Sequence, residues 1–110
     1  MDEHRIIGLT PSELMERLAV GERWLIVDVR EPWEIAIAAV DTAMAVPMAE
    51  IPAHLAKLDR QEAVAVLCHT GVRSAAVAAW LIEQGFARVA NIEGGIDAWS
   101  VYVDASIPRY

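Results

Sequence analysis

The chain has 110 residues, of which 55% are hydrophobic, and it carries a formal net charge of -7 at neutral pH. This length predicts one domain, residues 1–110, that is large enough for a hydrophobic core and too short for two such domains. The acidic balance, without any basic cluster, argues against nucleic-acid binding and disfavours contact with anionic membranes.

The first 40 residues predict two strands and two helices. Residues 6–9 indicate a short strand. Residues 10–19 follow as a helix that starts with a threonine–proline pair and a capping-box glutamate. Residues 24–27 form a continuous apolar run, which is typical of a strand buried on both faces. A second helix is expected over residues 31–39.

The rest of the chain continues this alternation. The expected elements are a strand at 44–46, a helix at 49–58, a strand at 63–67, a helix at 74–84, a strand at 89–91 and a short helix at 96–99. Strands that alternate with helices predict an α/β fold with a mostly parallel sheet covered by helices on both faces. The tail, residues 101–110, is expected to lie extended on the surface.

Three polar or reactive residues directly follow predicted strands. They are Asp28, Cys68 and Asn91. Right-handed crossovers bring the carboxyl ends of parallel strands to one edge of the sheet, where open α/β folds bind their ligands. We therefore expect the loops that carry these residues to share that edge.

Cys68 ends an apolar strand and precedes a predicted helix, so a thiolate there would face the positive end of a helix dipole. Lowering a thiol pKa by two units requires about 2.7 kcal/mol. The dipole typically supplies about 0.3–1 kcal/mol, so loop amides, helped by the flexible Gly71, would have to supply the rest. Alternatively, Cys68 is only a small buried residue. Arg73 either adds charge near the sulfur or braces the loop against Asp28 or Glu93.

Three segments resemble the single-domain rhodanese family in order and spacing. They are residues 26–34 (IVDVREPWE), 68–74 (CHTGVRS) and 91–99 (NIEGGIDAW). The resemblance implies a five-stranded parallel sheet flanked by helices. It also implies transfer of sulfane sulfur from a donor such as thiosulfate to a thiophilic acceptor through a cysteine persulfide.

The resemblance assigns roles to individual residues of this chain. Cys68 is the expected nucleophile, and the expected supporting residues are Asp28, Arg30, as a partner of Glu34, and Ser74. The amides of the loop are expected to cradle the outer sulfur of the persulfide. The residues of that loop are His69, Thr70, Gly71, Val72 and Arg73, and the candidate pocket wall consists of Trp33, Gly94 and Gly95.

The chain departs from the family pattern at two places. Residues 38–43 read AAVDTA where the family usually has a Gly-His-Ile-Pro-Gly-Ala turn, so a longer helix is expected there. His69 follows the cysteine where many thiosulfate-using members carry arginine or lysine. Because histidine is largely neutral near pH 7, a persulfide donor competes with thiosulfate as the expected substrate.

Other functions remain as alternatives. Cysteine-dependent phosphatases and arsenate reductases use a similar loop, but phosphatases place five residues between cysteine and arginine, whereas only residues 69–72 separate them here. A persulfide carrier or sensing module of the same fold is the main rival. We expect neither a cofactor nor a metal, because the three histidines lack metal-ligand spacing. The expected partners are a small sulfur donor and a thiol or protein acceptor.

The sequence also favours a cytoplasmic location. A single cysteine cannot form an internal disulfide, which fits a reducing compartment. The charged residues 1–5 are followed by no long apolar run, so no signal peptide is expected. No segment approaches the roughly 18 apolar residues of a membrane span. Residues 103–110 resemble the ending of some small bacterial rhodaneses.

Overall fold

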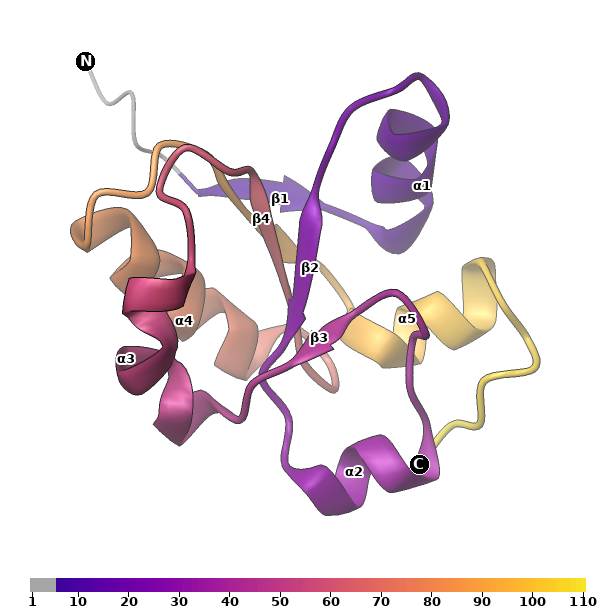
Figure 1. The fold of residues 1–110 in the computed structure, drawn as a ribbon. Coiled ribbons are helices and arrows are strands. Elements are labelled where there is room, and N and C mark those ends of the chain that lie inside the picture. Colours follow the sequence, from indigo (N-terminus) through magenta and orange to yellow (C-terminus); the bar gives the residue numbers. More distant parts are fainter. Residues whose placement is uncertain (1–5) are drawn as a thin grey trace.

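A five-stranded parallel sheet forms the centre of the molecule, with its strands in the order β1-β5-β4-β2-β3 (Figure 1). This computed structural model describes residues 6–110, so residues 1–5, on which the signal-peptide expectation partly rests, lie outside the described part. The five-stranded α/β architecture is confirmed. The strands are β1 (Ile7–Leu9), β2 (Leu25–Asp28), β3 (Met44–Ala45), β4 (Val64–Leu67) and β5 (Val89–Ile92).

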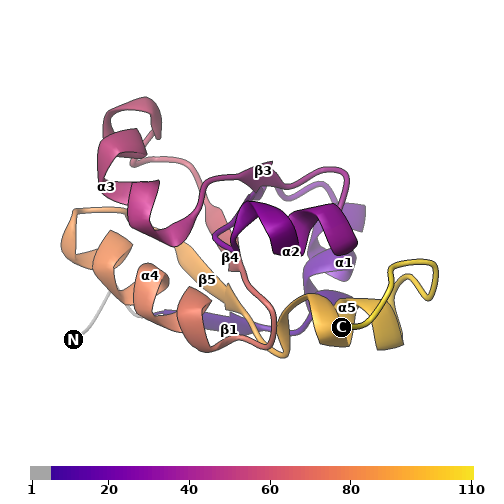
Figure 2. The same ribbon diagram turned by 90° about the horizontal axis from the view of Figure 1, so that it is seen from below.

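Helices cover both faces of the sheet. Figures 1 and 2 place α1 and α5 on one side of the sheet and α3 and α4 on the other, with α2 below β3. Within residues 6–110 no helix is long and apolar enough to cross a membrane. The helices are α1 (Pro11–Ala19), α2 (Pro32–Ile37), α3 (Ile51–His54), α4 (Val72–Glu83) and α5 (Gly95–Tyr102).

Strand β4 lies in the middle of the sheet and is completely buried. Side chains alternate between the two faces of a strand. Accordingly, Ala65 and Leu67 pack in the core under α1 and α5, whereas Val64 and Val66 pack in the core under α4. Cys68 continues this alternation by one residue, so its side chain belongs to the α4 side. The strand therefore delivers the thiol to the start of the helix that follows.

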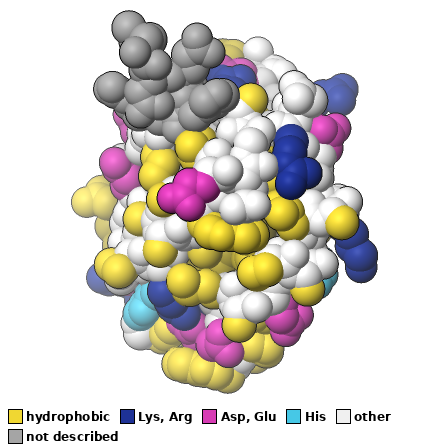
Figure 3. Space-filling model, turned by 90° about the vertical axis from the view of Figure 1, so that its left-hand side faces the viewer, with side chains coloured by type: hydrophobic (Ala, Val, Ile, Leu, Met, Phe, Trp, Pro, Cys, Tyr) yellow, Lys and Arg dark blue, Asp and Glu magenta, His cyan; other side chains and the backbone are white. Residues whose placement is uncertain are grey.

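The helix expected over residues 49–58 is wrong as a single element. The structure has a short 3₁₀ turn at Met48–Glu50, the four-residue α3 and a second 3₁₀ turn at Leu55–Lys57. Pro52 explains part of the interruption, because proline has no N–H to donate to the preceding turn. A shallow apolar groove of about 280 Å³ lies between this segment and α4, with Trp80 in its lining. Figure 3 shows apolar side chains gathered across this face.

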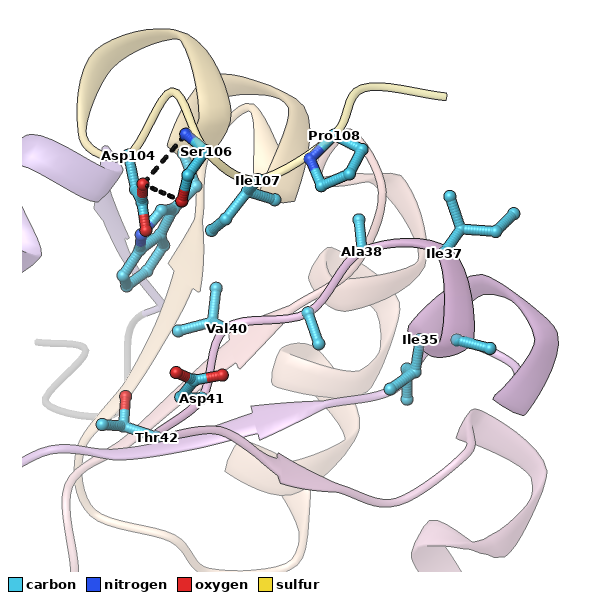
Figure 4. A pocket seen from close by; sticks show the side chains of 13 residues that line it. Ile35, Ile37, Ala38, Val40, Asp41, Thr42, Asp104, Ser106, Ile107 and Pro108 are labelled. Atoms are coloured by element: carbon cyan, nitrogen blue, oxygen red, sulfur yellow. Dashed lines mark hydrogen bonds between the residues drawn. The ribbon is translucent and has the colours of Figure 1, made fainter.

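The segment that replaces the family turn does not lengthen α2, contrary to expectation. Helix α2 ends at Ile37, and Ala38 is already extended, with φ -154° and ψ 134°. Ala38 and Val40 are buried because the tail packs beside them. Figure 4 shows the shallow cavity of about 410 Å³ between this segment and the tail, with Ile107 beside Val40.

The expectation of an extended surface tail is also wrong in part. Helix α5 continues through Tyr102, and the chain then turns back across the molecule. The buried Ile107 joins the core, and the Ser100 hydroxyl donates a hydrogen bond to its carbonyl oxygen. Apolar burial of one side chain therefore fixes the path of the whole segment and carries Tyr110 toward the loop after β4.

Candidate active site

The Cys68 sulfur is held by the amides of the loop that follows β4. Its side chain is only 1% exposed. The Gly71 amide nitrogen lies 3.1 Å from Sγ and the Ser74 amide nitrogen 3.3 Å, and both donate hydrogen bonds to it. The Gly71 amide is thus one of the loop amides expected to cradle the outer sulfur, and the Ser74 amide, outside that expected set, joins it. A sulfur in this position can accept hydrogen bonds as a thiolate at the N-terminus of α4.

Gly71 makes this loop geometry possible. Its φ of 104° lies in the left-handed region that other residues rarely adopt. Gly71 is the N-cap residue, and α4 begins at Val72, two residues earlier than the sequence predicted. Ser74 therefore lies inside the helix rather than at its start. The left-handed glycine ends the loop by itself, which leaves the Ser74 side chain available for the sulfur.

Ser74 and Asn91 form the floor of the site. The Ser74 hydroxyl oxygen lies 3.2 Å from Sγ, and the hydroxyl donates a hydrogen bond to Oδ1 of Asn91. The Asn91 side-chain amide in turn donates to the Gly71 carbonyl, at 3.2 Å. Asn91 was expected at this edge of the sheet but was not predicted as a site residue. Asn91 lies inside β5, opposite Val66 of β4, so the expectation that it follows the strand is wrong.

Hydrogen bonding outweighs burial in setting the ionisation of the thiol. Burial by itself raises the pKa of Cys68. Hydrogen bonding with the Ser74 side chain, and hydrogen bonds from the Ser74, Gly71 and Thr70 amides, lower it, and the net pKa lies below its usual value. The site therefore shifts the ionisation of Cys68 toward the thiolate, which is the nucleophilic form of cysteine.

Arg73 braces the loop against a carboxylate that the sequence did not single out for this role. Its Nη1 and Nη2 donate to Oε1 and Oε2 of Glu34 at 2.7 and 2.8 Å, which is a two-point ion pair. The partner is therefore neither Asp28 nor Glu93. These hydrogen bonds from Arg73 lower the pKa of the buried Glu34 carboxyl to about 2, against the opposing effect of burial.

Arg30 is completely buried and pairs with Asp28, and it meets Glu34, its expected partner, only at the carbonyl oxygen. Arg30 Nη2 lies 2.7 Å from Asp28 Oδ2, and Nε lies 3.0 Å from Oδ1. Nη2 also donates to the Ala38 carbonyl at 2.7 Å, and Nη1 lies 3.4 Å from the Glu34 carbonyl. A buried guanidinium is tolerated only when its donors are satisfied in this way. The Glu34 carboxylate remains free for Arg73.

Gly94 and Gly95 lie against the backbone of the cysteine loop. The amides of Ile96 and Asp97 donate to the carbonyls of Cys68 and His69, at 2.9 and 3.1 Å. A Cβ at Gly95 would lie 2.4 Å from the His69 carbonyl oxygen, which no real side chain tolerates. The two glycines therefore let α5 support the loop from its backbone side.

The outer residues of the site are more exposed. Thr70 and Val72 point outward, and the Val72 side chain is 76% exposed. Trp33 is 63% exposed and meets Tyr110 edge-on, with ring centroids 6.4 Å apart. Figure 2, from below, shows α2, the loop after β4 and the C-terminal residue on the same side of the molecule. His69 stacks on the Tyr110 ring, a residue that the sequence did not predict in the site.

Within residues 6–110 no group of three histidine, cysteine, aspartate or glutamate side chains is arranged to hold a metal ion. The single thiol and its amides are therefore the chemically distinctive feature of this edge. Of the expected site residues, Gly71 and Ser74 contact the Cys68 sulfur. Arg73 is tied to Glu34, and Trp33 lies at the periphery against Tyr110.

Comparisons with known proteins identify the family of this chain. The model of the "Rhodanese-like domain" family matches residues 10–101. A sulfurtransferase of Allochromatium vinosum is 40% identical over 81% of this chain and 83% of its own length. The rhodanese-like/PpiC domain-containing protein 12 of Arabidopsis thaliana is 45% identical over 90% of this chain, which spans 34% of that longer protein. The crystal structure of a rhodanese-like domain protein from Staphylococcus aureus superimposes with a TM-score of 0.81 at 32% identity, covering 96% of this chain and 99% of its own.

Proposed function

This chain belongs to the rhodanese-like sulfurtransferase family, and from that premise we propose that it carries sulfane sulfur as a persulfide on Cys68. The observation that carries the proposal is the pair of hydrogen bonds that the Gly71 and Ser74 amides donate to the sulfur. The lowered pKa of the thiol also supports it, because the thiolate is the attacking species.

The proposed reaction consists of two displacements. The Cys68 thiolate attacks the sulfane sulfur of the donor, the new S–S bond forms, and the donor leaves with the bonding electron pair, as sulfite when the donor is thiosulfate. A thiolate or cyanide acceptor then attacks the outer sulfur. The acceptor leaves as a persulfide or as thiocyanate, and the Cys68 thiolate is regenerated. No resolving cysteine is needed, because the acceptor supplies the second nucleophile.

The loop can support the persulfide as well as the thiolate. Amides that surround a developing negative charge stabilise it without reorganising, which is the principle of an oxyanion hole. The loop amides between Cys68 and the start of α4 are the groups proposed to serve the outer sulfur. The Arg73–Glu34 and Arg30–Asp28 ion pairs are proposed to keep that loop in place.

The structure supports a persulfide donor over thiosulfate. Both guanidinium groups near the loop are already paired with carboxylates, Arg73 with Glu34 and Arg30 with Asp28. The residue after the cysteine is His69 rather than a permanent cation, and the net charge of the protein is -7. Attraction of a dianionic donor is therefore weak, and a thiol persulfide is the proposed physiological donor class.

Intact mass spectrometry tests the proposal directly. After incubation with thiosulfate, or with a persulfide generated from a low-molecular-weight thiol, the protein should gain about 32 Da, the mass of one sulfur atom bound covalently. Subsequent addition of cyanide or excess thiol should remove this mass. Steady-state kinetics should be of the ping-pong type, since the two substrates react in separate steps.

The control is Cys68→Ser, which keeps the size of the side chain and removes the nucleophile. This variant should fold normally, gain no mass and show no turnover. Sulfur uptake by the variant equal to that of the wild type would overturn the assignment of Cys68. Uptake by the wild type without steady turnover to cyanide would instead favour a persulfide carrier over an enzyme.

A further inference from the structure

Tyr110 makes three contacts with the groups that surround the cysteine loop. Its ring lies flat on the His69 imidazole, with centroids 4.0 Å apart and planes inclined by 5°. Its hydroxyl donates to Oε2 of Glu34 at 2.8 Å and accepts a hydrogen bond from Nη1 of Arg30 at 2.9 Å. These contacts join residues that are 76 and 80 positions apart in the chain.

The hydroxyl bonds to members of two ion pairs, which the Arg30 Nη1 contact with the Glu34 carbonyl also links. Arg30 pairs with Asp28 at the end of β2, and Glu34 pairs with Arg73 in the first turn of α4. Tyr110 accepts from the first pair and donates to the second, so its hydroxyl adds a side-chain link between them. Burial is the main effect that raises the pKa of the Tyr110 hydroxyl, which therefore stays protonated and keeps donating.

The tail is held firmly enough to deliver this residue. Ile107 is buried, and Arg109 pairs with Asp97 through Nε and Oδ1 at 2.8 Å. Asp97 is also the residue whose amide donates to the His69 carbonyl. The backbone of His69 is thus held by α5 and its side chain by the tail, one from each side.

We propose that Tyr110 is a positioning residue for Cys68. Its ring immobilises His69, the first residue of the loop, and its hydroxyl holds the Glu34–Arg73 pair at the other end of the loop. With both ends fixed, the amides between them remain directed at the sulfur. The inference deepens the proposed function, on which its relevance to sulfur transfer rests. The tail becomes part of the active site without touching the reacting atom.

The test measures the thiol before any sulfur chemistry. The pH dependence of Cys68 alkylation by iodoacetamide reports the thiol pKa, which a residue with a purely structural role would leave unchanged. Tyr110→Leu removes both the stack and the hydroxyl, and we expect the pKa to rise by roughly half a unit as the amides lose their alignment. Tyr110→Phe keeps the ring, and a smaller rise is expected.

The same variants are then loaded with a thiol persulfide under single-turnover conditions. At a pH below the thiol pKa, the loading rate of Tyr110→Leu should fall about threefold, in proportion to its thiolate fraction. Tyr102→Leu is the matched control, because Tyr102 lies on α5 with its side chain 74% exposed. It should match the wild type in both measurements.

Two results would overturn the proposal. One is a wild-type alkylation profile in folded Tyr110→Leu, even if its melting temperature falls. The other, should Tyr110→Leu fail to fold, is a wild-type profile in Tyr110→Phe. If wild-type protein takes up no sulfur, the proposed function fails, but the alkylation profiles still decide the role of Tyr110.

Discussion

The side chains around the thiol are arranged in pairs whose members satisfy each other, with Cys68 as the exception. Arg30 is bound by Asp28, and Arg73 by Glu34. The sulfur instead accepts hydrogen bonds from amides, which cannot neutralise it by proton transfer. A thiolate held in this way keeps its charge and its nucleophilicity. The ion pairs stabilise the frame, and the reactive group depends on the backbone.

The acid sensitivity of the fold should depend on Glu34. Its pKa of about 2 lies below the usual 4.5, so its contribution to stability is complete above pH 4.5 and is lost as the pH falls toward 2. We expect Glu34→Gln to cost roughly 2 kcal/mol at pH 7, after allowance for the partial exposure of Arg73. Urea unfolding between pH 2 and 7 measures this cost.

The difference between the wild type and Glu34→Gln should shrink steadily below pH 4.5, because the carboxyl binds a proton in the unfolded state from about that pH and in the folded state only near pH 2. The control is Glu16→Gln, on the exposed face of α1. Parallel curves for the wild type and Glu34→Gln over the whole pH range would contradict the prediction.

At the level of elements, the site is made where helix starts meet strand ends. The N-terminus of α4 and the N-terminal residues of α5 both lie against the cysteine loop. Two glycines allow this close approach, because Gly71 adopts a left-handed φ and Gly95 has no side chain to strike the loop carbonyls. The packing of α5 therefore supports the loop that carries the thiol, whereas α4 donates to the sulfur itself.

Gly95→Ala should displace the cysteine loop. The added methyl would lie 2.4 Å from the His69 carbonyl and 2.5 Å from the Cys68 carbonyl, at a φ of 59°. We expect a loss of more than about 3 kcal/mol, from backbone strain together with overpacking. Denaturant unfolding measures the loss of unfolding free energy, and the rate of Cys68 alkylation reports whether the loop is displaced.

The matched control is Gly21→Ala, where φ is 97° and nothing lies within 4 Å of the new methyl. It isolates the backbone strain and should cost about 1–2 kcal/mol, with no change in thiol reactivity. Equal losses in the two variants would show that the contact between α5 and the loop is not tight.

The molecule as a whole is acidic, and the thiol lies at the edge of a sheet within that field. A net charge of -7 repels anions at long range, and salt screens this repulsion. The cations close to the loop are already paired with carboxylates and add little attraction. The net charge thus repels an anionic reagent at long range, whereas the loop amides attract it locally.

Two alkylating reagents of similar shape separate these effects. Iodoacetate is anionic and iodoacetamide is neutral. The rate with iodoacetate divided by the rate with iodoacetamide is independent of the fraction of Cys68 that is ionised. We expect this ratio to rise with ionic strength, because salt screens the long-range repulsion of iodoacetate. Stopped-flow or mass-spectrometric rates at several salt concentrations measure it. A ratio that falls with salt would mean that the loop amides dominate.

The features that could be predicted from the sequence are those set by residues close together in the chain. The run from β4 through Cys68 to α4 is contiguous, so the alternation of strand side chains and the following helix start already place the thiol at an amide-rich end. The capping box of α1, with Thr10 and Glu13 bonded to each other's amides, is local in the same sense and is confirmed.

Partners that are distant in the chain were decided by tertiary structure. Glu34 rather than Asp28 or Glu93 receives Arg73, because Asp28 is already taken up by the buried Arg30. Tyr110 reaches His69 only because Ile107 is buried and turns the tail back across the molecule. The partner of Arg73 depends on competition among several polar groups, and the contact of Tyr110 with His69 depends on the path of the tail. Neither this competition nor the path of the tail can be inferred from the spacing of residues. The sequence therefore determined where the thiol lies, and the packed fold determined which residues hold it.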